Sequence, residues 1–441
     1  MSKYIGVLLV ILALVLSACA PTAVPAAAPA AESGAEAAAP ATGEAVELTM
    51  GSWRVDDVAQ MEAILAKFNE AYPDITIKFD PTNPPDYNAT LRTQLEGGTG
   101  PDLFYLRSFA TSRQLFDEGF LEPITDLPGL KENFTDAARA VWGTEEGVSY
   151  GVPFIAVSHG IYYNMSLFEE LGLAVPTTWE ELITTAQAIQ DAGYIPFANA
   201  SGDTWTIAEI VFMNLAPNFI GGLEGRQAYL SGERCFNDEN AVAAFQAVAD
   251  IAPFLPEGQE ALVYYDSQSL FTTGQAAMWM GGSWDIPFFE TEIIDFDWSV
   301  FATPAPAGQD RYVTFHLDAG MAVNAASTKK EAAGVFVDWL MGQTFAAGLA
   351  NELPGFFPIH LEAPEVSNVH AGAFLALNEG AAGTDVRWAW DGLLDGTPDG
   401  YTLMQDGAIA VIKGEMTPQE AADALQNGLA EWLPAAQSCG Q

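Results

Sequence analysis

The chain has 441 residues, of which 58 are acidic and 16 are basic, so its formal net charge is −42. This charge excludes nucleic acid as a partner and disfavours anionic ligands, because long-range repulsion opposes their approach. The hydrophobic content of 49% indicates a globular protein, and the acidic residues are scattered along the chain as on a solvated surface.

The first residues are typical of a secretory signal. Lys3 precedes an apolar run, Val7–Leu16, which is shorter than the roughly 20 residues of a membrane-spanning helix. The segment that ends at Cys19 resembles the bacterial lipobox, in which the cysteine is acylated. We therefore expect residues 1–18 to be a lipoprotein signal peptide and Cys19 to carry the lipid anchor. An ordinary secretory signal that contains a cysteine by chance is the alternative.

The next segment, residues 19–45, is dominated by Ala and Pro with Thr, Gly, Ser and Glu, and it lacks apolar periodicity. Such a segment buries too little surface to offset its ordering entropy, so we expect a flexible, lipid-anchored tether. The chain beyond it is too long for one ordinary core, and two lobes are expected.

The folded body begins with alternating strands and helices. Strands are predicted from alternating side chains, and helices from apolar stripes of helical spacing. The expected strands are 46–50, 75–79 and 103–106, and the expected helices are 58–68 and 87–95, the first capped by Asp56 or Asp57. This β-α-β-α-β order implies a parallel sheet flanked by helices.

The later chain continues in the same style. A capping box is expected at Thr178–Glu181, where it opens a helix. The other expected elements are strands at 161–163, 276–280 and 298–301 and helices at 330–341 and 418–432. Two α/β lobes fit this order better than one continuous sheet.

Cysteine and histidine carry no metal motif. Besides Cys19 the chain has only Cys235 and Cys439, which are candidates for a disulfide in an oxidising compartment, although sequence alone leaves their pairing open. The four histidines show no HExxH or HxH spacing. We therefore expect no metal and no cofactor.

Short motifs follow one another through nearly the whole body. They are GPDLFY at 100–105, GFLEPI at 119–124, YGVPF at 150–154, IYYN at 161–164, PTTWEEL at 176–182, FTTGQAAM at 271–278 and KGEMTPQEA at 413–421. In this order, and behind a lipobox and a tether, they resemble the extracellular solute-binding proteins of ABC transporters. The resemblance is to the carbohydrate-binding type that includes maltodextrin-binding protein.

This resemblance implies an α/β, two-lobed periplasmic-binding-protein-like fold with hinge crossings between the lobes. The crossings map near 154–158, 316–320 and 353–358, where Pro153, Gly320, Pro354 and Gly355 suit special backbone geometry. Lobe 1 is expected to comprise 46–155 and 318–353, and lobe 2 to comprise 156–317 and 354–441. The ligand favours a closed state because it contacts both lobes.

A sugar offers apolar faces and a rim of hydroxyls, so its site needs aromatic platforms and short polar groups. Trp53 follows the first strand, where α/β sheets place ligands. The resemblance implies that Trp284 is a stacking residue and that Trp205 lies in a sugar-contact region. It also places Trp388 and Trp390 near another stacking position.

The polar candidates are Arg54, Arg107, Ser108, Ser158, Asp285 and Asp318. Arg107 and Ser108 follow the strand at 103–106, and the two aspartates are acceptors for sugar hydroxyls. An acidic contact of the maltodextrin-binding relative corresponds to Val157 here. This departure puts a maltodextrin ligand in doubt.

Some short motifs also suggest other functions. The stretch 147–151 matches the GxSxG pattern of a hydrolase, but that site requires a helix after the serine, and Pro153 follows at once. Tyr162-Tyr163 and Tyr264-Tyr265 suggest a ferric-ion site, and acids with aromatics also suit a polyamine.

We therefore predict a non-enzymatic, monomeric sugar-binding component of an ABC importer, which takes an oligosaccharide or glycoside. It is expected to be anchored by lipid at the extracytoplasmic face of the cell membrane, where it meets the permease subunits. A polyamine-binding or ferric-ion-binding protein, or a secreted glycoside hydrolase, is the alternative.

Overall fold

The computed structural model describes residues 45–362, 364–385 and 392–440. The predicted signal peptide, Cys19, and the tether up to residue 44 lie outside these residues, as do Trp388 and Trp390.

The first strands and helices form as the sequence predicts. Strands β1 (Val46–Ser52), β2 (Ile75–Pro81) and β3 (Leu103–Leu106) alternate with helices α1 (Val58–Ala71) and α2 (Pro84–Glu96). Strand β1 pairs in parallel with both β2 and β3, which confirms the parallel sheet. Asp57 holds the N-cap position of α1 without capping it, because its carboxylate binds Arg54 instead.

The other strands lie further along the chain. They are β4 (Val152–Asn164), β5 (Ile195–Phe197), β6 (Ala276–Gly282), β7 (Trp298–Phe301), β8 (Tyr312–Val323), β9 (Phe357–Pro358) and β10 (Gly383–Asp385). The predicted strands at 161–163, 276–280 and 298–301 are confirmed as parts of β4, β6 and β7.

The remaining helices are mostly short. Before η1 they are α3 (Ala110–Asp117), α4 (Leu130–Asn133), α5 (Asp136–Ala140), α6 (Met165–Leu171) and α7 (Trp179–Asp191). The π-helix η1 (Thr206–Phe212) is followed by α8 (Met213–Leu215), α9 (Pro217–Ile220), α10 (Gly222–Leu230), α11 (Glu239–Ile251), η2 (Ala252–Phe254), η3 (Gln259–Ala261) and α12 (Tyr264–Thr272). The last group is η4 (Ser283–Asp285), α13 (Ile286–Glu292), α14 (Lys330–Leu340), α15 (Gln343–Glu352), α16 (Val369–Ala376), α17 (Gly400–Ile412), α18 (Pro418–Leu429) and α19 (Pro434–Ser438).

The helix caps match the sequence in part. Thr178 caps α7 by accepting a hydrogen bond from the Glu181 N–H, but the Glu181 carboxylate accepts from Thr177 instead of closing the box. A complete capping box forms at α18, where Thr417 and Glu420 bind reciprocally. The predicted helices at 330–341 and 418–432 are confirmed as α14 and α18.

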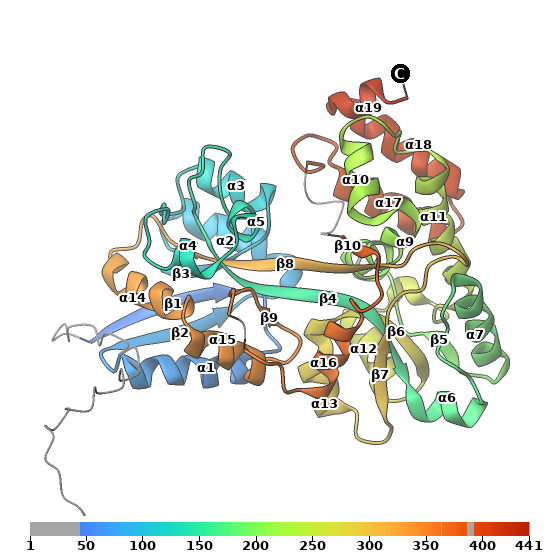
Figure 1. The fold of residues 1–441 in the computed structure, drawn as a ribbon, viewed down its shortest axis with the longest axis horizontal. Helices are drawn as coiled ribbons and strands as arrows, with labels where there is room; N and C mark the ends of the chain where they lie inside the picture. Colours follow the sequence, from blue (N-terminus) through green and yellow to red (C-terminus); the bar gives the residue numbers. More distant parts are fainter. Residues whose placement is uncertain (1–44, 363, 386–391, 441) are drawn as a thin grey trace, which may run out of the picture. The chain divides into compact units, whose positions relative to one another are not determined.

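Among the described residues the strands form one hydrogen-bonded path in the order β2-β1-β3-β8-β4-β6-β5. Strands β4 and β8 lie side by side and antiparallel (Figure 1). Each continues past its first partner: β8 pairs with β3 and β10, and β4 pairs with β6, β7 and β9. The continuous path, which the sequence made less likely than two lobes, arises because the two long strands β4 and β8 take part in the pairing at both of their ends.

The chain returns to the first strands after β8. Helix α14 packs against β1 and β8, and α15 packs against α1.

Gly320 in β8 lies against Trp142, and a Cβ atom there would lie 2.6 Å from the indole ring. Gly320 is therefore required for close packing, whereas Gly355 does adopt the special backbone geometry that the sequence suggested, with φ of +93°.

Among the described helices, none is by itself long and apolar enough to cross a membrane, although the pair Thr206–Ile220 and Gly222–Leu230, bent by 88°, passes by length and composition.

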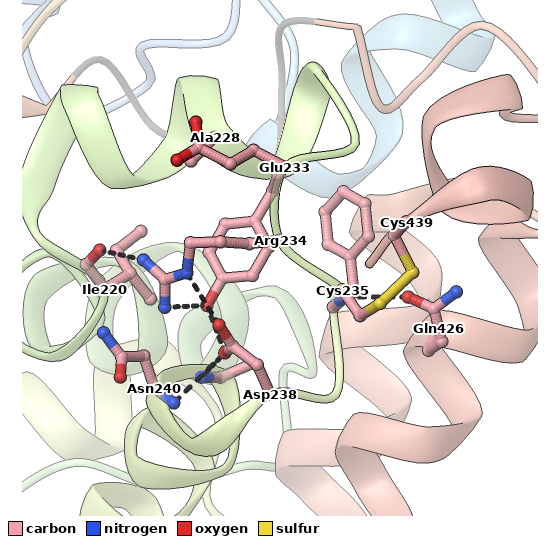
Figure 2. A network of polar contacts seen from close by, with 12 residues as sticks. Ile220, Ala228, Glu233, Arg234, Cys235, Asp238, Asn240, Gln426 and Cys439 are labelled. Carbon is pink, nitrogen blue, oxygen red and sulfur yellow. Dashed lines mark hydrogen bonds and ion pairs between the residues drawn. A yellow bond between two sulfur atoms is a disulfide. The ribbon is translucent and has the colours of Figure 1, made fainter. Parts of the chain in front are cut away.

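A disulfide between Cys235 and Cys439 links the segment before α11 to the C-terminal end (Figure 2). Next to it, the Gln426 amide accepts from the Phe236 N–H at 2.8 Å and donates to the Ala436 carbonyl at 2.7 Å. These contacts hold α19 and α18 against the start of α11.

Replacing both Cys235 and Cys439 by serine is expected to lower the free energy of unfolding by about 2–4 kcal/mol, because the cross-link restricts the unfolded chain. Urea unfolding with and without a reductant measures this. The reductant should lower the midpoint of the native protein and leave that of the double variant unchanged. An unaltered native midpoint in full reductant would contradict a stabilising disulfide.

Candidate functional site

A cavity of about 440 Å³ lies among residues that are far apart in sequence. Its volume falls within the range of about 300–1,000 Å³ that is usual for small-molecule sites. The lining residues come from the ends of β1 and β3, the start of α2, η1, α12, η4, β8 and the start of α17. They are Trp53, Arg54, Asp56, Pro84, Pro85, Asn88, Arg107, Thr111, Thr204, Trp205, Glu209, Tyr264, Trp284, Asp318, Phe356, Leu394, Asp399, Tyr401, Thr402 and Gln405.

The residues singled out in the sequence divide into two groups. Those that line the cavity are Trp53, Arg54, Arg107, Trp205, Trp284 and Asp318. Ser108, Ser158 and Asp285 do not line it, and each is buried. The cavity lies at the carboxyl ends of the parallel strands β1 and β3, where α/β sheets place their ligands.

Trp53 and Arg107 form one wall. The Arg107 guanidinium carbon lies 3.9 Å from the centre of the Trp53 ring, a cation–π contact. Tyr87 and Tyr105 meet the same indole edge-on at 5.5 and 5.4 Å. Arg107 forms no ion pair with any described residue, so its hydrogen-bond donors remain for a ligand.

Arg54 joins three segments of the chain. Its guanidinium pairs with Asp57, donates to the Trp284 carbonyl at 3.4 Å and lies 5.0 Å from the centre of the Phe356 ring. Burial lowers the pKa of Arg54, but the charge and hydrogen bond of Asp57, together with the charge of Asp56, raise this pKa above its ordinary value, so the side chain stays cationic. Arg54 therefore fixes Trp284 and Phe356 relative to the end of β1.

Aromatic side chains from η1, α12 and η4 form a second wall. The rings of Trp205 and Tyr264 lie 5.0 Å apart, and the Trp284 indole N–H donates to the Tyr264 hydroxyl at 3.0 Å. The His159 ring meets Trp284 edge-on at 5.1 Å. Sequence analysis did not assign Tyr264 to a sugar site; its only signal was the unexplained pair Tyr264-Tyr265.

The aspartate after Trp284 faces away from the cavity. Asp285 is 2% exposed, and its carboxylate accepts hydrogen bonds from Tyr264, Gln268 and Trp279. Burial raises the pKa of Asp285 to about 6, although the hydrogen bonds from Tyr264 and Gln268 oppose the rise. The predicted ligand residue Asp285 therefore does not line the cavity, whereas the adjacent Trp284 does.

Ser108 and Ser158 serve the packing of the strands. The Ser108 hydroxyl donates to the Leu317 carbonyl of β8. The Ser158 N–H donates to the Ser283 hydroxyl at 3.0 Å, and Ser158 is fully buried in β4. Neither of these two predicted ligand residues lines the cavity.

A polar wall of the cavity was not predicted from the sequence. Glu209 in the π-helix η1 accepts from the Tyr401 hydroxyl at 3.2 Å, and Asp399 caps α17 by accepting from the Thr402 N–H at 2.8 Å. Gln405 lies one turn further along α17. An aspartate just before a helix is a readable cap, but nothing local indicates that this helix end faces the cavity.

The tyrosine pairs do not form a metal site. Tyr162 donates to the Gly282 carbonyl at 2.8 Å, whereas Tyr163 packs against Phe168, because adjacent residues of a strand face opposite ways. Burial raises the pKa of Tyr264 well above its ordinary value, so its hydroxyl stays neutral. Among the described residues no group of three or more His, Cys, Asp or Glu side chains is placed to hold a metal ion.

The GxSxG stretch is not a nucleophile elbow. Ser149 is 5% exposed and pairs with Gly143 in an isolated bridge, and strand β4 begins at Val152. A nucleophile elbow requires a helix directly after the serine.

The sequence matches the family of bacterial extracellular solute-binding proteins over residues 52–344, more than half of the chain. The protein belongs to this family. Its members bind solutes, so the protein is a binding protein and not an enzyme, as the sequence predicted.

Individual relatives are distant in sequence. The chain is 24% identical over 296 residues to the multiple sugar-binding protein of Streptococcus mutans, covering 64% of this chain and 68% of the relative. A structure from work on xylan utilization by the thermophilic bacterium Caldanaerobius polysaccharolyticus has a TM-score of 0.75 at 20% identity, over 87% of this chain and 99% of that one. A chitin oligosaccharide binding protein has a TM-score of 0.74 at 22% identity, over 87% and 98%. These structures confirm the two-lobed α/β fold.

Proposed function

We propose that this solute-binding protein is the extracytoplasmic sugar-binding component of an ABC importer, and that its ligand is a neutral oligosaccharide or glycoside held in the 440 Å³ cavity. The observation that carries this proposal is the make-up of the walls. Indole and phenol rings offer faces for the apolar sides of pyranose rings, while guanidinium and carboxylate groups offer donors and acceptors for hydroxyls.

The charges of the walls favour a neutral ligand over a polyamine. The carboxylates of Asp56, Glu209, Asp318 and Asp399 line the cavity, but the cationic Arg54 and Arg107 line it too. A polyamine would meet both guanidinium groups at short range, whereas a hydroxyl binds equally well to either charge. The names of the similar proteins, which mention multiple sugars and a chitin oligosaccharide, agree with this class of ligand.

The proposed site residues are the cavity-lining ones. Trp205 and Trp284 supply stacking faces, Arg107 donates, and Asp318 accepts. The polar wall formed by Glu209, Asp399, Tyr401, Thr402 and Gln405 is added to them.

The anchoring and the lobes belong to the same proposal. We place the lipid at Cys19, outside the described residues, and the tether at 19–45. The lobes are taken as 46–155 with 318–353 and 156–317 with 354–441, joined through β4, β8 and the segment before β9. A ligand that contacts Arg107 on one side and Trp205 on the other would favour the closed, monomeric form that the permease subunits recognise.

Titration calorimetry with the purified protein tests the ligand class. The panel contains neutral oligosaccharides and glycosides, spermidine, and ferric citrate. We expect saturable binding of at least one neutral saccharide, and a ligand concentration 100 times its Kd should stabilise the fold by about 2.7 kcal/mol in thermal unfolding. Binding of spermidine or ferric ion without binding of any saccharide would overturn the proposal, and turnover of a glycoside would contradict a binding-only role.

A further inference from the structure

The carboxylate of Asp285 is buried behind the aromatic wall and does not line the cavity. Asp285 accepts hydrogen bonds on both of its oxygens: Tyr264 and Gln268 donate to Oδ1, the latter at 2.8 Å, and the Trp279 indole donates to Oδ2 at 3.2 Å. Asp285 is 2% exposed and does not line the cavity. A carboxylate that is removed from water in this way is stable only with such donors.

The bonds form a directional chain that ends in the cavity. The Trp284 indole N–H donates to the Tyr264 hydroxyl at 3.0 Å, and this hydroxyl in turn donates to Asp285. The Tyr264 ring also packs against Trp205, with ring centres 5.0 Å apart. The orientation of the Trp205 and Trp284 indoles therefore depends on one phenol, and the direction of its O–H bond depends on Asp285.

We propose that Asp285 is a positioning residue of the sugar site, which as a carboxylate fixes Tyr264 and, through it, the indoles of Trp284 and Trp205. This inference rests on the proposed function, because it assigns those indoles to the ligand. Only an ionised carboxylate is acceptor-only on both oxygens. A carboxylic acid or an amide places a donor on one of them, opposite Tyr264 or Trp279.

Charged and titratable groups approach Asp285 and its partners from several elements. Arg54 after β1 and Tyr162 of β4 act on the carboxylate network electrostatically. His159 of β4 packs on Trp284, and Asp57 at the start of α1 pairs with Arg54. Burial is the largest influence, and it raises the pKa of Asp285 to about 6.

The sign of the pH dependence follows from this pKa. Above pH 6 the folded protein holds the ionised form, which positions Tyr264. Below pH 6 it takes up a proton that the unfolded chain binds only near pH 4. Protonation therefore stabilises the fold and weakens the ligand site, so stability and affinity change in opposite directions as the pH falls from 7 to 5.

The test compares the native protein with Asp285→Asn. At pH 8 the native protein should bind the saccharide found by calorimetry about 10- to 100-fold more tightly than the variant, the factor carried by a charge-assisted hydrogen bond. At pH 5 the two affinities should converge, because protonated Asp285 and asparagine are both neutral. A ratio that is constant across this pH range, or equal affinities at pH 8, would overturn the proposal.

A matched control carries the same charge change on α12, the helix that contains Tyr264. Asp266 lies in the first turn of α12 and is exposed. Asp266→Asn should retain the native affinity and its pH dependence, and a loss equal to that of Asp285→Asn would assign the effect to net charge and contradict the proposal.

A ligand-free measurement separates this proposal from the proposed function. In ¹⁵N-labelled protein, the indole N–H signals of Trp279 and Trp284 should shift in Asp285→Asn and should titrate together near pH 6 in the native protein. The titration should persist in His159→Gln, which removes the imidazole ring that packs on Trp284. Indole signals that do not move, or a titration lost with His159, would overturn the positioning role, even if no saccharide binds.

Discussion

Trp205→Ala should weaken saccharide binding roughly 30- to 150-fold, which corresponds to about 2–3 kcal/mol, the usual cost of removing an aromatic anchor from the centre of a binding site. Trp205 is only partly buried, lines the cavity and packs on Tyr264 with one side of its ring. Its removal deletes a ligand platform without emptying the core. Calorimetry gives the affinity, and thermal unfolding gives the stability.

Two variants separate ligand stacking from packing. Trp205→Phe keeps an aromatic face and should lose less than about tenfold, since most of the contact area remains. Phe219 in α9 is also partly buried and packs on Trp179 at 5.4 Å, but it does not line the cavity. Phe219→Ala should therefore lower stability and leave the affinity unchanged. Native affinity in Trp205→Ala would show that this indole does not hold the ligand.

Gly355→Ala should lower the free energy of unfolding by about 2–5 kcal/mol. Gly355 has φ of +93°, and a Cβ atom built there would lie 1.9 Å from the Ser283 carbonyl oxygen. Left-handed backbone costs a residue with a side chain about 1–2 kcal/mol, and an overpacked contact adds typically 1–3 kcal/mol. The Ser283 hydroxyl also donates to the Gly355 carbonyl, so a shift of either segment breaks this bond.

Gly334 provides the matched glycine. It lies inside α14, and a Cβ atom there meets nothing within 4 Å. Gly334→Ala should therefore raise the free energy of unfolding by about 0.5–1 kcal/mol, since alanine is the better helix former. Urea unfolding of the two variants measures both effects. Equal stabilities for Gly355→Ala and the native protein would contradict the strained contact with Ser283.

Much of the first sheet was predictable because its information is local. Alternation and helical stripes gave the order of β1, α1, β2, α2 and β3. The rule that ligands lie beyond the carboxyl ends of parallel strands then pointed to Trp53 and Arg107, and both line the cavity. These predictions needed only the periodicity of each element and the direction of its chain.

Predictions of which of two adjacent side chains faces the cavity were less accurate. Trp284 and Asp285 were both predicted as site residues, but Trp284 lines the cavity while the Asp285 carboxylate binds Gln268 of α12. The tyrosine pair at 264–265 was considered only as a metal site, whereas Tyr264 is part of the aromatic wall. Sequence spacing gives the face of a regular helix or strand, but a short turn such as η4 has no repeating period to extrapolate.

By itself the sequence determined the family, the α/β character and six of the residues that line the cavity, out of nine candidates that the structure describes. Only the tertiary structure decided that Arg54 meets the Trp284 carbonyl, that Glu209 meets Tyr401, and that Cys235 and Cys439 lie 5.1 Å apart between Cα atoms. Each of these contacts joins segments separated by about 190 residues or more. Local side-chain patterns specify which face of an element is buried, and the packing of all elements together determines which distant face it meets.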